Sequence, residues 1–167
     1  MLSPGLRKLA LTVHVGTSVA FPGAVGCFLA LAAVGLMSND IATARAAYAA
    51  MDLITSTVVV PLCLAALVTG LISSLGTAWG LFRYWWIVLK LVGTLASTII
   101  LIVHLRPIGV MAIAATPTQL AGTQLQLLLA AGAALAALAL FLALSIYKPR
   151  GLTLYGARKL NEMRGAS

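Results

Sequence analysis

Four long apolar runs constrain the fold of this chain more than any other feature. They cover about residues 9–36, 53–73, 85–105 and 125–147. An α-helix needs about 20 apolar residues to cross the hydrocarbon core of a bilayer, and the helix satisfies its own backbone hydrogen bonds there. The sequence therefore predicts an all-α, polytopic membrane protein with a four-transmembrane-helix bundle in residues 1–147.

The composition supports a membrane protein and argues against nucleic-acid binding. Of the 167 residues, 62% are hydrophobic and 8% are charged, whereas soluble domains carry about 25% charged residues. The formal net charge is +8, but the basic residues lie between and after the apolar runs. They are typical of orientation signals and of contacts with anionic lipid headgroups, so no nucleic-acid partner is predicted.

The distribution of basic residues predicts the orientation of the chain. Cytoplasmic loops of membrane proteins carry an excess of Lys and Arg, and the two sides of the four spans differ nine to two. We therefore expect both termini to be cytoplasmic, with residues 148–167 as a basic cytoplasmic tail. The larger set is Arg7, Lys8, Arg83, Lys90, Lys148, Arg150, Arg158, Lys159 and Arg164, and the smaller set is Arg45 and Arg106.

Three ionisable residues are predicted to gather on the outer side. Asp52 precedes the second run, and His104 and Arg106 end the third. Because consecutive antiparallel spans pack together, Asp52 and His104 should share a level and form a polar contact, directly or through one water. A carboxylate there would orient the imidazole and favour its protonated form. The alternative is that Asp52 caps a helix N-terminus.

On the inner side, the polar positions are His14, Lys90 and Arg83. Lys90 either extends along the helix to the headgroups or points into the bundle as a functional ammonium. His14 is expected to be neutral and bonded to a hydroxyl or carbonyl of a neighbouring span. Its level lies roughly 18 Å from that of His104, so the two histidines of one chain should not ligate a single haem.

Hydroxyl residues form a predicted seam between the second and third spans. Arg83, Lys90, Ser97 and His104 recur every seven residues, with Thr94 between them, and Ser56 lies on the second span. The seam residues are therefore Ser56, Thr94 and Ser97. Such stripes allow close helix packing, and they also suit a polar pathway or ligand cleft.

Three stretches carry a resemblance to a known family: "HVGTSVAFPGAVGCFLAL", "GTAWGLFRYWWIVLKLVGTLAST" and "SIYKPRGLTLYGARK". In these stretches the chain resembles a group of small bacterial integral membrane proteins classed as a domain of unknown function. Where the family pattern has a Trp-Gly pair, this chain has Phe21, Pro22 and Gly23. The resemblance implies four spans in a bacterial cytoplasmic membrane and no established activity.

The motifs leave three hypotheses for function. The chain has no nucleotide-binding, hydrolase or metalloprotease motif, only three acidic residues and no metal-ligand spacing. The first hypothesis is a non-enzymatic accessory subunit or self-associating bundle, whose partner is a larger membrane complex or a second copy. The second is a b-type haem protein in electron transfer, with His14 as the cofactor ligand. The third is a small transporter along the third span.

Overall fold

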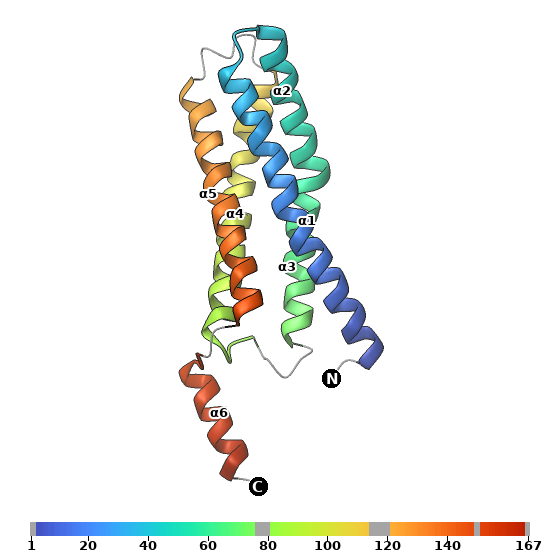
Figure 1. Ribbon diagram of the computed structural model, residues 1–167, viewed down its shortest axis with the longest axis vertical. Coiled ribbons are helices and arrows are strands. Elements are labelled where there is room, and N and C mark those ends of the chain that lie inside the picture. Colours follow the sequence, from blue (N-terminus) through green and yellow to red (C-terminus); the bar gives the residue numbers. More distant parts are fainter. Residues whose placement is uncertain (1–2, 76–80, 114–120, 149–150, 166–167) are drawn as a thin grey trace.

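The computed structural model describes residues 3–75, 81–113, 121–148 and 151–165, and these residues form an elongated antiparallel helix bundle with a short extra helix (Figure 1). Its elements are α1 (Pro4–Met37), α2 (Ile41–Ile54), η1 (Thr55–Val59), α3 (Val60–Leu75), α4 (Trp85–Ile113), α5 (Ala121–Tyr147) and α6 (Leu154–Gly165).

Four of the helical rods are long and apolar enough to cross a membrane, which confirms the predicted all-α bundle. All four are longer than the predicted runs. The rod made of α2, η1 and α3 spans 35 residues and is therefore about 52 Å long at 1.5 Å per residue. The hydrocarbon core is only about 30 Å thick, so parts of these rods extend beyond it or tilt within it.

The second rod begins at Ile41, twelve residues earlier than predicted. The segment before Leu53 lies outside the second predicted run, 53–73. Its alanines instead favour helix, and one face is buried at helical spacing against the rest of the bundle. The buried residues are Ala44, Ala47, Tyr48, Met51 and Thr55. Asp40 caps this helix by accepting hydrogen bonds from the N–H groups of Ala42 and Thr43.

A π-helical turn joins α2 to α3. The N–H of Val60 bonds to the carbonyl of Thr55, and Pro61 follows without an N–H of its own. The hydroxyls of Thr55, Ser56 and Thr57 each donate to a carbonyl one turn earlier. The helical rod therefore continues through the proline because one turn widens to a π-helix.

The third rod passes through Pro107, although the sequence predicted an end at about residue 105. Helices usually end before a proline, yet α4 continues to Ile113. Beyond the proline, Ile108 and Met111 are each only 2% exposed. Packing of these two side chains into the core stabilises the last two turns.

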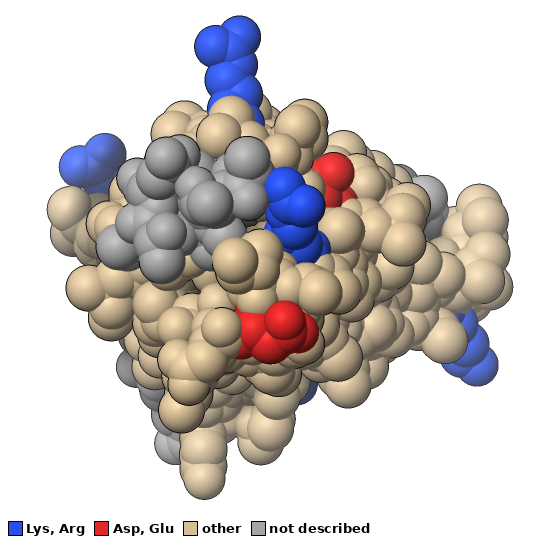
Figure 2. All heavy atoms as spheres, turned by 90° about the horizontal axis from the view of Figure 1, so that it is seen from above, with Lys and Arg blue, Asp and Glu red and all other residues tan. Residues whose placement is uncertain are grey.

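The two ends of the bundle differ. Both termini lie at one end (Figure 1), which we call the terminal end. The other end, which we call the turn end, carries the α1–α2 turn and the last residues of α4. Figure 2 shows the turn end from above, where acidic and basic side chains are isolated on a mostly uncharged surface.

The hydrophobic core is concentrated toward the turn end. Helix α1 packs against α2, α3 and α5, and α2 packs against α4. A second, smaller cluster of Phe21, Val25, Val59 and Cys63 continues the core toward the middle of the bundle. The main cluster contains Phe28, Ala32, Ala44, Tyr48, Met51, Ile108, Met111, Leu127 and Ala131.

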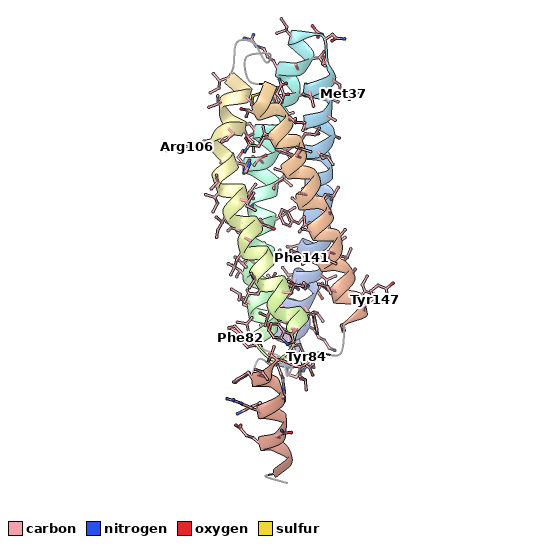
Figure 3. The ribbon with its side chains drawn as sticks, turned by 90° about the vertical axis from the view of Figure 1, so that its left-hand side faces the viewer. Met37, Phe82, Tyr84, Arg106, Phe141 and Tyr147 are labelled. Carbon is pink, nitrogen blue, oxygen red and sulfur yellow. The ribbon has the colours of Figure 1, made fainter. Side chains whose placement is uncertain are left out.

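The terminal half contains no buried residue in 3–20, 67–75, 85–97 or 132–147, within the described part of the chain. Gly93 on α4 lies close to Phe141 on α5 in this half. A Cβ on Gly93 would lie 2.1 Å from the edge of the Phe141 ring, so glycine makes room for this ring. Figure 3 labels Phe141. The terminal half is therefore packed more loosely than the turn half.

Helix α6 is attached to the start of α4 rather than being a free tail. The backbone N–H of Thr153 donates to the Arg83 carbonyl at 3.1 Å, and the Trp85 N–H donates to the Gly151 carbonyl at 3.1 Å. The Thr153 hydroxyl donates to the Phe82 carbonyl and accepts from the N–H of Gly156. The segment predicted as a basic tail thus contains a helix that projects from the terminal end (Figure 1).

Candidate functional site

Four helices each contribute one polar side chain to a site in the terminal half. These are His14 from α1, Thr69 from α3, Lys90 from α4 and Ser145 from α5, and we call them the polar site. His14 bonds to Thr69, and Lys90 bonds to Ser145. All four side chains are half-buried, so this site lies inside the bundle.

The ring of His14 is fixed by two neighbours on α3. Its Nδ1 lies 3.2 Å from Thr69 Oγ1, and that hydroxyl gives its own proton to the Ala65 carbonyl at 2.6 Å. Nδ1–H must therefore be the donor, as a neutral imidazole has one donor and one acceptor nitrogen. A Cβ on Gly70 would lie 3.0 Å from His14 Cε1, so glycine lets the ring approach α3. The expected bond from His14 to a neighbouring hydroxyl is confirmed, and Nε2 is then the acceptor nitrogen of the neutral ring.

Lys90 points into the bundle instead of along α4 to the headgroups. Its ammonium donates to Ser145 Oγ, and Ser145 in turn donates to the Phe141 carbonyl at 2.8 Å. Of the two orientations predicted for Lys90, the structure has the inward one.

The charge of Lys90 has no acidic partner within the described residues. The chain has three acidic residues. Asp40 lies in the α1–α2 turn, Asp52 lies beside Gly109, and Glu162 pairs with Lys159 on α6 at 3.6 Å. A charged group away from water is costly unless it is paired. The ammonium of the polar site therefore has no compensating acidic charge among the described residues.

The predicted seam is only partly inside the bundle. Ser56 is exposed, and its hydroxyl bonds back to its own helix. Thr94 and Ser97 are half-buried. Thr98, one residue beyond the predicted stripe, is buried and contacts α3, with its hydroxyl 3.2 Å from the sulfur of Cys63.

The expected outer cluster does not form a direct contact. His104 Nδ1–H donates to the Ile100 carbonyl at 2.8 Å, and Gln126 Nε2 lies 3.5 Å from its Nε2. Asp52 lies deeper along α2 than the sequence suggested, with Oδ1 3.8 Å from a Cβ placed on Gly109. The expected direct Asp52–His104 bond is absent because Asp52 is within a helix and meets α4 about 7.5 Å beyond His104. Arg106 is exposed on α4 (Figure 3).

Arg83 is part of the connection between α4 and α6, since its carbonyl accepts a hydrogen bond from Thr153. It is not one of the four polar-site residues.

The sequence analysis did not identify Thr69, Ser145 or Thr98. For Ser145 a signal existed, because it is the one hydroxyl residue between Gln126 and Tyr147. Thr69 and Thr98 could be chosen only with the rotation of each helix known.

The polar site can offer a cation to an anionic ligand and an imidazole lone pair to a proton or a metal. No group of three or more potential metal ligands occurs in the described ranges. A haem fits these residues in two respects: His14 Nε2 has the lone pair that iron needs, and Lys90 could pair with a propionate.

The fold and the site define a class of protein: a multi-pass helical membrane protein with a cationic polar site between its helices. Comparison with protein-family models, curated proteins and solved structures finds no match. The resemblance to a family of small bacterial membrane proteins therefore stays a prediction.

Proposed function

We propose that this protein is a non-enzymatic membrane bundle that binds an anionic ligand at the polar site. The observation that carries the proposal is Lys90, an inward-pointing ammonium with no acidic partner among the described residues. Burial of such a charge reduces stability, and an anionic ligand would compensate it.

The other hypotheses make different demands on this site. A bundle that only packs against a copy of itself or a larger membrane complex has no need of Lys90. A transporter needs a route through the turn half, where Tyr48, Met51 and Leu127 are at most 2% exposed. These side chains fill the bundle between the polar site and the turn end. This supports a binding site that opens only toward the terminal end.

Native mass spectrometry of the purified full chain tests the proposal. Wild-type protein and Lys90→Met are compared with Lys148→Met, which removes an exposed lysine. We expect an anionic small molecule to stay bound to the wild type and to Lys148→Met and to be lost from Lys90→Met. Equal occupancy in all three would contradict the proposal and favour a packing subunit.

A b-type haem is the second candidate ligand, and the fixed tautomer of His14 favours it. Histidine ligands of metals commonly donate their second ring nitrogen to a neighbouring group, as His14 does to Thr69. The purified protein should then show a Soret band that His14→Ala abolishes and His104→Ala retains. A protein without this band after growth with excess haem would exclude this candidate.

We further propose that the terminal end faces the cytoplasm of a bacterial cell, with the membrane being the cytoplasmic membrane. The nine-to-two distribution of basic residues supports this orientation. In a Cys27→Ala background, an impermeant thiol reagent added outside should label Ala42→Cys and not Asn161→Cys. The reverse labelling pattern would invert the proposed topology.

A further inference from the structure

The hydrogen bonds within the polar site determine which donors remain for a ligand. The hydroxyls of Thr69 and Ser145 donate to the carbonyls of Ala65 and Phe141, and His14 Nδ1–H donates to Thr69. A lysine ammonium has three N–H donors, of which one is used on Ser145. The four side chains therefore offer a ligand two N–H groups, both from Lys90, and one acceptor, His14 Nε2.

This inventory favours a carboxylate over a phosphate. Two donors on one positive charge suit the two oxygens and single negative charge of a carboxylate. A phosphate has three or four oxygens and up to two charges, and it would leave several acceptors unsatisfied in a region with little water, which is costly. The helical backbone N–H groups around the site are already used within their helices.

The surroundings of the site indicate what the rest of the ligand is like. Lys90 lies five residues beyond Trp85, about 7.5 Å along α4, and Trp85 is exposed at the level where aromatic residues meet headgroups. No described residue of α4 between Trp85 and Ser97 is buried, whereas protein interiors are normally close-packed. A headgroup larger than a carboxylate would have to leave the interface to reach Lys90, while an apolar chain would complete the packing of this half.

We infer that the ligand is a long-chain monocarboxylate, bound with its carboxylate on Lys90 and its apolar chain against the terminal half of the bundle. This inference rests on the proposed anion-binding function and adds the chemical class of the ligand. Binding of this ligand requires no rearrangement of the turn half, whose core is filled by its own side chains.

Equilibrium binding of radiolabelled palmitate to the purified full chain tests this inference. Hexadecyl phosphate and hexadecan-1-ol serve as competitors, so that the three probes share a chain and differ in the headgroup. We expect saturable palmitate binding that weakens about tenfold or more in Lys90→Met, as expected for loss of a charged hydrogen bond. Lys148→Met should bind like the wild type, and hexadecan-1-ol should compete poorly.

Each other outcome has a defined meaning. If hexadecyl phosphate binds more tightly than palmitate with the same dependence on Lys90, the carboxylate class is wrong and the anion site stands. If neither anion binds in a Lys90-dependent way, or if the alcohol binds as well as both anions, the inference and the proposed function both fall. Should Lys90→Met not fold, Lys90→Gln in the same assay decides, because it keeps a polar side chain and removes the charge.

Discussion

The two halves of the bundle are built from similar apolar helices, yet they pack differently. In the turn half, large side chains such as Tyr48, Met51 and Met111 are almost fully buried. In the terminal half, the interior positions are taken by His14, Thr69, Lys90 and Ser145, and apolar packing is loose. The turn half therefore contributes most of the folding stability. The terminal half is less tightly packed and contains a charged site instead.

The largest effect is expected from shortening a side chain in the turn-half core. Met51 is 0% exposed, so Met51→Ala should lower the free energy of unfolding by about 2–5 kcal/mol through lost contacts and a residual cavity. Leu53→Ala, two residues along and 62% exposed, should change it by less than about 0.5 kcal/mol. Denaturant unfolding in mixed micelles measures both. Similar values for the two variants would show that the turn half is not the stabilising core.

Two glycine-to-alanine substitutions compare how well each half tolerates an added methyl group. A Cβ on Gly35 would lie 2.6 Å from the Tyr48 ring, and one on Gly93 would lie 2.1 Å from the Phe141 ring. Gly35→Ala should cost about 1–3 kcal/mol, the usual cost of overpacking, because Tyr48 has no room to move. Gly93→Ala should cost less despite the shorter distance, because Phe141 lies in loosely packed surroundings. Thermal unfolding measures the stability loss of both variants, with Gly26→Ala as the control because a Cβ there meets no atom within 4 Å. A larger loss in Gly93→Ala than in Gly35→Ala would contradict the difference in packing between the halves.

Removal of the Lys90 charge should have a smaller effect and the opposite sign. In protein stripped of bound lipid and ligand, Lys90→Met should raise the free energy of unfolding by about 1 kcal/mol, since an apolar side chain of similar length removes an unpaired interior charge. The same unfolding assay measures it, with Lys148→Met as the control. A loss of stability would mean that Lys90 is a structural residue.

The smallest effect is expected at the α1–α2 turn when the pH is lowered. Hydrogen bonds from the Thr43 hydroxyl, and then from the backbone N–H groups of Thr43 and Ala42, hold the pKa of Asp40 below its usual value of 3.8. The cap therefore contributes its full stability above about pH 4, and the contribution is lost as the pH falls through the lowered pKa. Helicity by circular dichroism should show this loss in the wild type. Asp40→Asn, which caps without a charge, should remove that part of the pH dependence.

The sequence alone predicts the helices well and the contacts between them poorly. Long apolar runs determine four spanning helices, and intramembrane histidine and lysine mark positions that need partners. The alanine-rich start of α2 was missed because its hydropathy is modest, and this error moved Asp52 to a helix start. The partners of His14 and Lys90 depend on how each helix is rotated. A difference of one residue, as between Ser97 and Thr98, turns a side chain by about 100°.

Hydrogen–deuterium exchange along α4 in lipid nanodiscs tests the central contrast most directly, because both halves are sampled on one helix in one membrane. Exchange reports local opening. The account predicts that amides of residues 86–97, beside the polar site, exchange faster than those of residues 98–112, where Thr98, Ile108 and Met111 are buried. Equal protection in the two segments, or stronger protection in 86–97 in ligand-free protein, would contradict a tightly packed turn half and a loosely packed terminal half.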